Sequence, residues 1–263
     1  MAQPLSVQLY TVRDAFGADP VAALKRLADI GFTQVEPFAI ANFADQLAEA
    51  LPASGLGVSS AHAGLVADDV DAHEVLAVAQ RLGVPVVIDP FVAPEKWQSR
   101  DDVLATAAKL NELVAPAADL GLKVGYHNHA HELQSRIDGV TALELFAGAL
   151  HEAVVLEVDT YWSEIGGESA VALLGRLGEQ VQFLHIKDGP RVDDVKTQTA
   201  AGRGEMPIAE ILAAAPHATP VVELDDHAGG DMFDDVTESF RYLTEELGQT
   251  AGTRAGGANG AAL

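Results

Sequence analysis

Residues 154–188 read VVLEVDTYWSEIGGESAVALLGRLGEQVQFLHIKD, and this stretch contains the unit from which the whole chain is built. Two short runs rich in β-branched residues, 154–159 and 181–186, flank a longer segment rich in Ala and Leu. Such short runs are typical of strands, and apolar residues at helical spacing predict a helix between them. The stretch therefore predicts a strand–helix–strand unit.

The same alternation runs through most of the sequence. The strand-like runs lie at residues 5–10, 33–38, 57–62, 84–89, 122–127, 154–159, 181–186 and 219–224, and their starts are 24 to 38 residues apart. Eight such units in about 250 residues match one closed (β/α)8 barrel, the TIM barrel. An open doubly wound sheet more often carries a glycine-rich phosphate loop after its first strand, where this chain has QLYTVRD.

Composition indicates where the folded domain ends and which classes of partner are unfavourable. We expect residues 1–248 to form the barrel, and residues 249–263, which are small and polar, to form a flexible tail. The 39 acidic and 16 basic side chains give a formal charge of −23, which opposes binding to nucleic acid. The sequence has no cysteine, no visible signal peptide and no run long enough to span a membrane. We therefore expect a cytoplasmic protein without a membrane partner.

Polar side chains gather where the predicted strands end. In a TIM barrel the active site lies at the carboxyl ends of the strands. The candidates there are Glu36, His62, Asp89, His127, Asn128, His129, His131, Glu132, Asp159, His185, Lys187, Glu223 and Asp225. Such a ring of carboxylates and imidazoles is costly to bury unless its members are paired or bind a cation.

Alternation of side chains along a strand indicates which of these residues share a face. The sets with common parity are Gly125, His127 and His129; Val155, Glu157 and Asp159; Val181, Phe183, His185 and Lys187; and Val221, Glu223 and Asp225. In each set, small or apolar residues come first and a polar residue stands at the end of the strand. A barrel with an apolar interior and a site at its mouth requires this order. The pattern alone does not say which face lies inside, and the register that the four sets share favours these faces.

Two carboxylates and an imidazole on neighbouring strands predict a metal site. Asp159, His185 and Glu223, with a fourth ligand from the fifth strand, form a mixed oxygen and nitrogen donor set. That set suits Mn²⁺, Mg²⁺, Co²⁺ or Zn²⁺, and we expect Mn²⁺ first. Taken singly, Asp159 is also compatible with a helix cap, and His185 with a hydrogen-bonded core residue.

Five motifs occur in an order that resembles a known family. They are YHNHAHEL at 126–133, EVDTYW at 157–162, FLHIKD at 183–188, GRGEMPIAEIL at 202–212 and VVELDD at 221–226. With the opening VQLYTVRD, they resemble the xylose-isomerase-like barrel superfamily over residues 4–247. The closest likeness is to its sugar phosphate isomerase/epimerase branch, which includes inosose dehydratases and tagatose-type epimerases.

The resemblance implies one divalent metal held by Glu132, Asp159, His185 and Glu223. The fifth-strand ligand has an alternative, because the position of the epimerases' strand glutamate is here His127, and Glu132 follows five residues later. We favour Glu132. His127 and His129 would then face the substrate.

The expected chemistry is isomerisation or epimerisation of a sugar or keto-sugar. The metal would polarise a carbonyl and stabilise an enediolate, while His127 or His129 removes the α-proton. Lys187 would hold a substrate oxygen, although a salt bridge is equally compatible with its position. The expected substrate contacts are Glu36, His62, Trp162 and, in a loop between two glycines, Arg203.

Other functions remain open at the level of sequence. A lyase that dehydrates an inosose or cleaves a 3-keto-glycoside would use the same metal site. An endonuclease-IV-like phosphodiesterase needs further metal ligands and a basic groove, and only Glu36, His62 and Asp89 are on offer. A sugar-binding barrel without catalysis is disfavoured by the candidate bases. Relatives of this kind are often dimers, and the sequence leaves the oligomeric state, including a homo-oligomer, open.

Overall fold

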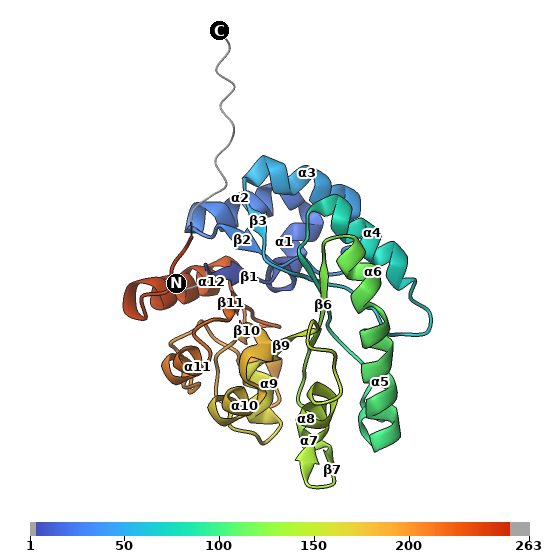
Figure 1. The fold of residues 1–263 in the computed structure, drawn as a ribbon. Helices are drawn as coiled ribbons and strands as arrows, with labels where there is room; N and C mark the ends of the chain where they lie inside the picture. Colours follow the sequence, from blue (N-terminus) through green and yellow to red (C-terminus); the bar gives the residue numbers. More distant parts are fainter. Residues whose placement is uncertain (1–3, 253–263) are drawn as a thin grey trace.

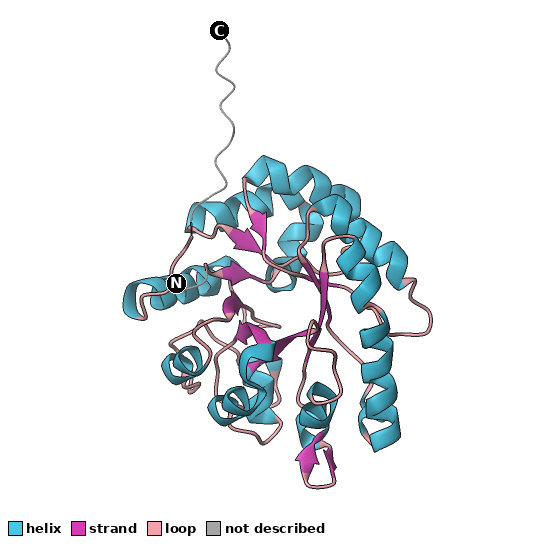
Figure 2. Cartoon of the chain, viewed as in Figure 1, coloured by secondary structure: helices cyan, strands magenta, loops and turns pink. Residues whose placement is uncertain are grey.

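Parallel strands form the centre of the computed structural model, which describes residues 4–252, and helices form an outer ring around them (Figures 1 and 2). The central strands are β1 (Ser6–Val7), β2 (Gln34–Val35), β3 (Gly57–Val58), β4 (Ala61–His62), β5 (Val86–Asp89), β6 (Lys123–His127), β9 (Val155–Asp159), β10 (Val181–Ile186) and β11 (Thr219–Val222). Seven of them form one sheet in the order β1-β11-β10-β9-β6-β5-β4.

Two isolated bridges close this sheet into a barrel. Gln8 pairs with Glu36, which joins the end of β1 to β2, and Phe38 pairs with His62, which joins the end of β2 to β4. β2 also pairs with β3, the first half of the third barrel strand. The predicted single (β/α)8 barrel is thereby confirmed.

Helices and short helical turns connect the strands. The α-helices are α1 (Arg13–Ala18), α2 (Pro20–Ile30), α3 (Ala44–Ser54), α4 (Ala72–Leu82), α5 (Arg100–Glu112), α6 (Val114–Asp119), α7 (His131–Gln134), α8 (Ala142–Ala147), α9 (Thr160–Ile165), α10 (Ala170–Leu177), α11 (Ile208–Ala214) and α12 (Met232–Arg241). The turns are η1 (Leu9–Val12), η2 (Pro94–Trp97), η3 (Gly178–Gln180), η4 (Val195–Thr197) and η5 (Tyr242–Glu246). No helix within residues 4–252 is long and apolar enough to cross a membrane.

The early strands are shorter than the sequence pattern suggests. The expected strand at 57–62 is divided into β3 and β4 at Ser59 and Ser60. The two hydroxyls bind inward instead of continuing a regular strand: Ser59 Oγ lies 2.8 Å from Ser6 Oγ, and Ser60 Oγ donates to the Glu36 carboxylate. The Ser60 contact holds the Glu36 carboxylate in place inside the barrel.

A small antiparallel hairpin was not expected from the sequence. β7 (Arg136–Ile137) pairs with β8 (Val140–Thr141) at the periphery of the barrel (Figure 2). Asp138 and Gly139 join them with φ angles of 52° and 89°. Positive φ at both central residues is the requirement of the tight hairpin turn for which Asp-Gly is favoured.

The residues that the alternation groups on one face of each strand lie in the interior of the barrel. A separate apolar cluster consists of Val86, Ile88, Val155, Phe183 and Val221. Gly125 completes this layer, because a Cβ at that position would lie 2.8 Å from a Val155 methyl group. The polar residues of the same parity follow further along each strand, at the carboxyl ends. The barrel floor is therefore apolar and its mouth is polar.

The ordered chain continues past the expected boundary at residue 248. The Leu5 amide donates to the Thr250 carbonyl at 2.8 Å, and Thr33 Oγ1 donates to the Ala251 carbonyl at 2.5 Å. These bonds tie residues 250 and 251 to the start of β1 and to the residue before β2. The remainder of the expected tail, 253–263, lies outside the described residues.

Candidate active site

A cavity of about 590 Å³ opens at the carboxyl ends of the barrel strands. Its polar wall is made of His62, His127, His129, Trp162, Lys187, Glu223 and Asp225. Volumes of this size are typical of small-molecule sites. The predicted location of the active site therefore coincides with a real cavity.

Asp159 is held at the end of β9 by its backbone amide and by one carboxylate oxygen. Its amide donates to Asn128 Oδ1 at 3.1 Å, and its Oδ1 accepts the Trp162 amide at 2.9 Å, which caps α9. The other oxygen, Oδ2, is buried and accepts no hydrogen bond of standard geometry from the described residues. Asp159 thus serves as a helix cap and still offers one oxygen to the site.

His185 lies between carboxylates on both sides of its ring. Nδ1 is 2.6 Å from Glu223 Oε2, and Nε2 is 2.7 Å from Glu36 Oε1 and 3.1 Å from Glu157 Oε2. Burial opposes a charged ring, but the Glu157 and Glu223 carboxylates raise the pKa of His185 well above its usual value. The ring is fixed in orientation by these contacts.

Lys187 places a cation among three carboxylates at the mouth of the barrel. Its ammonium is 2.9 Å from Asp159 Oδ2, 2.8 Å from Glu223 Oε2 and 2.8 Å from Asp225 Oδ2. Burial opposes this charge, but the surrounding carboxylates raise the pKa of Lys187 well above its usual value. The same ammonium lies 5.6 Å from the centre of the Trp162 ring. Lys187 therefore makes the salt bridges that were the alternative to a substrate contact, and it also lines the cavity.

Two groups of side chains have donor atoms close enough to hold a metal ion. Asp159, His185 and Glu223 form one group, and in each group the donor atoms lie within 4.8 Å of one another. The other consists of His62, His127, Glu157 and His185. The donor set of two carboxylates and one imidazole fits a divalent cation of borderline hardness, and its Asp159 Oδ2 pairs with the Lys187 ammonium. The structure thus brings together three of the four ligands that the resemblance implies.

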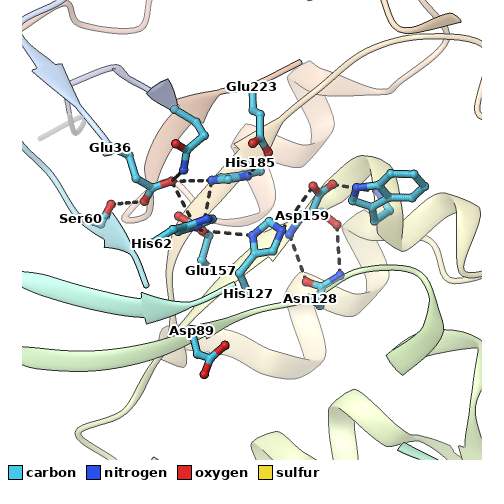
Figure 3. Close-up of polar contacts among 12 residues, drawn as sticks. Glu36, Ser60, His62, Asp89, His127, Asn128, Glu157, Asp159, His185 and Glu223 are labelled. Carbon is cyan, nitrogen blue, oxygen red and sulfur yellow. Dashed lines mark hydrogen bonds and ion pairs between the residues drawn. The ribbon is translucent and has the colours of Figure 1, made fainter. Parts of the chain in front are cut away.

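A second polar layer lies under this group, where Glu36, His62, Glu157, His127 and His185 turn toward one another (Figure 3). Glu157 Oε2 is 2.5 Å from His62 Nε2 and 3.1 Å from His127 Nδ1. The other oxygen of Glu157 is buried without a hydrogen-bond partner among the described residues. Glu157 was not among the predicted site residues, although its parity with Asp159 placed it on the inward face.

Glu36 lies below the cavity rather than in its wall. Its carboxylate is fully buried and accepts hydrogen bonds from Gln8 Nε2 at 2.8 Å and from Ser60. The expected contact of Glu36 with substrate is therefore replaced by a contact with His185, which it orients from beneath.

His127 and His129 follow one another on the inward face at the end of β6. His127 is buried, and its Nε2 lies 3.8 Å from Asp159 Oδ2 while its Nδ1 faces Glu157. Burial, with the neighbouring His185, lowers the pKa of His127 to about 3. Burial, with His127 nearby, lowers the pKa of His129 to about 2. His129 Nδ1 has no hydrogen-bond partner among the described residues.

Glu132 is buried at the start of α7, beside the cavity rather than in its wall. Its Oε1 accepts the Tyr126 hydroxyl at 2.6 Å, and its Oε2 accepts the His129 amide at 2.9 Å. Burial raises the pKa of Glu132 to about 7. Both oxygens are thus occupied by the chain, and Glu132 belongs to neither group of possible metal ligands within the described residues.

Arg203 lies away from the site, on the outside of the barrel. Its guanidinium binds Glu238 of α12 and is largely exposed. Its neighbours Gly202 and Gly204 were expected to allow close backbone approach to a substrate, and they instead approach Asp188. Their amides donate to Asp188 Oδ2 at 2.9 and 3.0 Å, and a Cβ on Gly204 would lie 2.2 Å from Asp188 Oδ1.

Asp188→Asn is expected to destabilise the fold by about 2–3 kcal/mol, because an amide nitrogen would face backbone donors that now share a charged acceptor. Asp188 is buried and also accepts the amides of Gly189 and Met206. Urea unfolding of the variant measures the loss. The exposed Asp193 gives a matched control, Asp193→Asn, with an expected change within about 0.5 kcal/mol. Equal midpoints for the two variants would contradict the role of Asp188.

Asp89 also lies apart from the side chains that could hold a metal ion (Figure 3). Its carboxylate accepts the amides of Leu65 at 2.7 Å, Val66 at 2.9 Å and Phe91 at 3.1 Å. Asp89 therefore fixes two loops at the mouth of the barrel and is not a further metal ligand.

The chain is a (β/α)8 barrel with buried carboxylates and imidazoles at the carboxyl ends of its strands. Proteins of this class can hold a metal ion beneath a small-molecule cavity. The chain belongs to the xylose isomerase-like TIM barrel family, whose model matches residues 24–219. No curated protein matches the sequence.

Several solved structures share the fold. A sugar phosphate isomerase/epimerase from Parabacteroides distasonis ATCC 8503 is similar with a TM-score of 0.77 and 22% identity, over 92% of this chain and 94% of the other. A probable 3-DHS dehydratase of Bacillus anthracis, involved in petrobactin synthesis, has a TM-score of 0.70 and 13% identity, over 92% and 99%. The IOLI protein, solved with a zinc atom, has a TM-score of 0.65 and 14% identity, over 92% and 97%.

Proposed function

We propose that the protein is a divalent-metal-dependent isomerase or epimerase that acts on a sugar or keto-sugar. The observation that carries this proposal is the convergence of Asp159, His185 and Glu223 beside the cavity that Lys187 and His129 line. A metal-capable centre next to a cation and an unpaired imidazole contains the groups that proton transfer beside a carbonyl requires.

Asp159, His185 and Glu223 would hold the metal, with a fourth donor from β6. We propose His127 for that position, because its Nε2 faces Asp159 Oδ2 while its Nδ1 is oriented by Glu157. A carboxylate behind a ligating imidazole is the usual arrangement at metal sites. Glu132, the ligand that the resemblance implies, is the alternative, and it would have to share its hydrogen-bonded oxygens with the metal. Mn²⁺ is the proposed ion, with Mg²⁺, Co²⁺ and Zn²⁺ as alternatives.

When bound, the metal polarises the substrate carbonyl and stabilises the charge that develops as the α-proton leaves. His129 carries the free nitrogen in the cavity wall, so it is the proposed acceptor of that proton. Its lowered pKa keeps the ring neutral but makes it a weak base, so proton transfer to it would depend on the acidity that a bound metal gives the α-carbon. Lys187 is placed to donate a hydrogen bond to a substrate oxygen. Trp162 offers an apolar ring to one face of the sugar, and His62 lines the same wall.

Return of the proton to another position or face completes an isomerisation or epimerisation. Loss of a leaving group from the next carbon would instead complete an elimination, so a lyase of an inosose or 3-keto-glycoside uses the same residues. The chain's formal charge of −23 continues to oppose a nucleic-acid substrate. A cytoplasmic location and a homo-oligomer remain part of this proposal.

The test is a screen of the purified, Mn²⁺-supplemented protein against keto-sugars, inososes and 3-keto-glucosides in D₂O, with products followed by mass spectrometry. A product of unchanged composition that carries deuterium on carbon supports the isomerase or epimerase. A product lacking water, or a released aglycone, replaces it with the lyase. Absence of both product and deuterium exchange on every substrate would contradict the proposed function.

His185→Ala is expected to lower metal affinity by at least about 10-fold, since the substitution removes a donor held on both sides by carboxylates. Calorimetric titration with Mn²⁺ measures the affinity. His73→Ala is the matched control, because His73 is exposed on α4, and its affinity should equal that of the wild type. Equal binding by His185→Ala and wild type would remove His185 from the ligand set.

A further inference from the structure

The ammonium of Lys187 contacts more acceptor atoms than it has hydrogens. It is buried and lies 2.9 Å from Asp159 Oδ2, 2.8 Å from Glu223 Oε2 and 2.8 Å from each carboxylate oxygen of Asp225. An ammonium carries three hydrogens, so these four oxygens leave no N–H free. With these contacts in place, Lys187 has no donor to offer to a substrate oxygen.

Two of these contacts are with proposed metal ligands. Asp159 can offer only Oδ2, because its Oδ1 accepts the Trp162 amide at 2.9 Å. A metal–oxygen bond is ~2.2 Å long, so an ion bound to this Oδ2 would lie within about 5 Å of the ammonium in its present position. At that separation and an effective dielectric constant of about 20, the repulsion between a divalent ion and an ammonium corresponds to much more than a 10-fold loss of affinity. Lys187 therefore competes with the metal for Asp159 and Glu223.

Asp225 is the third acceptor of the ammonium, and it belongs to neither group of possible metal ligands within the described residues. Gln198 fixes it twice: its Nε2 donates to Asp225 Oδ2 at 2.8 Å, and its Oε1 accepts the Asp225 amide at 2.7 Å. Gln198 is itself buried, and Arg13 Nη1 donates to the Asp225 carbonyl at 2.8 Å. Asp225 is therefore an acceptor that is held in place independently of Asp159 and Glu223.

The charge of the three carboxylates matches two cations. Asp159, Glu223 and Asp225 carry three negative charges when ionised, and a divalent ion and one ammonium together carry three positive charges. A ligating His185 is neutral and adds no charge. Without Asp225, two carboxylates would face three positive charges in a buried site, which is unfavourable. Asp225 thus allows the site to hold both cations at once.

We infer that Asp225, fixed by Gln198, is a positioning residue that receives the Lys187 ammonium when a metal ion takes Asp159 and Glu223. This inference rests on the proposed function and adds an order of events to it. Bound to the two oxygens of Asp225 alone, the ammonium keeps its third hydrogen for the cavity that it lines. Lys187 then gains a free N–H for a substrate oxygen only after the metal has bound.

The test is calorimetric titration with Mn²⁺ of the wild type, two single variants and their double variant. Lys187→Met should bind Mn²⁺ at least about 10-fold more tightly than the wild type, because the competing charge is gone. Asp225→Asn should bind at least about 10-fold more weakly, since the ammonium then stays on Asp159 and Glu223. In the Lys187→Met background, Asp225→Asn should change the affinity by no more than about 3-fold, because there is no ammonium left to receive.

Matched controls and a second measurement accompany this cycle. Lys196 and Asp193 are exposed and follow β10, so Lys196→Met and Asp193→Asn should bind Mn²⁺ as the wild type does. Lys187→Gln, which keeps a hydrogen-bond donor without the charge, should also bind more tightly and guards against a misfolded Lys187→Met. A crystal structure of the Mn²⁺-loaded wild type should show the ammonium bonded to Asp225 and no longer to Asp159 Oδ2.

Unchanged or weaker binding by both Lys187 variants would overturn the inference. An equal loss from Asp225→Asn with and without Lys187, or an ammonium still bonded to Asp159 in the loaded crystal, would overturn it as well. Absence of Mn²⁺ binding by the wild type and every variant would overturn the proposed metal dependence together with this inference. The full pattern of affinities without turnover of any sugar would reject the proposed function and leave the inference standing.

Discussion

Removal of divalent metal by EDTA and dialysis is expected to abolish turnover and to lower the melting temperature by about 5–10 °C. The range follows from an ion present at about 100 times its dissociation constant, which stabilises the folded state by about 2.7 kcal/mol. Addition of Mn²⁺ or Co²⁺ should restore both properties. Scanning calorimetry and the turnover assay, run on the same samples, measure the two effects.

The protein should remain folded without metal, because Lys187 compensates part of the buried negative charge. Its ammonium contacts Asp159, Glu223 and Asp225. The His185→Ala variant provides the control, since a protein that has lost a ligand should show little further change with EDTA. Full turnover by the dialysed protein in excess EDTA would contradict the proposed metal dependence.

The barrel was predictable because its strands and helices differ in period and in composition. Along β9 and β10 the alternation also groups the residues that share a face, and the apolar cluster that contains Val155 and Phe183 shows that this face points inward. The lengths of the early strands were not predictable. The strand is divided at Ser59 and Ser60, whose hydroxyls contact Ser6 and Glu36, residues that are distant in sequence.

Prediction of the candidate site from sequence was limited in a similar way. Parity placed Glu157 on the same face as Asp159, but only the folded barrel shows its carboxylate against the rings of His62 and His127. Arg203 illustrates the opposite case. Its flanking glycines suggested a substrate loop, whereas their close approach is to Asp188, which sequence spacing alone does not reveal.

The last residue of the HIKD motif has a structural role that its neighbours do not share. His185 and Lys187 point into the barrel, and Asp188 binds the loop that carries Gly202 and Gly204. A motif shared with a family therefore contains residues that line the candidate active site and residues that stabilise the fold. Only the contacts of each side chain separate the two.

Three substitutions near the end of β6 distinguish the fourth metal donor from the base, and two of them are expected to lower catalysis strongly. His127→Ala should come out depleted of metal, because the proposed donor Nε2 is lost. Glu132→Gln should stay loaded, because its oxygens serve Tyr126 and the His129 amide. His129→Ala should stay loaded but turn over about 10²-fold more slowly, the usual scale for a general base.

Metal content by elemental analysis and turnover, measured on the same three preparations, decide between the arrangements. A depleted Glu132→Gln together with a loaded His127→Ala would establish Glu132 as the ligand and leave His127 facing the substrate. The exposed His73 again supplies the control, since His73→Ala should match the wild type in both measurements. If all three variants are loaded and fully active, the carboxylates and imidazoles of β9–β11 suffice for metal binding and turnover. The residues at the end of β6 then supply neither ligand nor base.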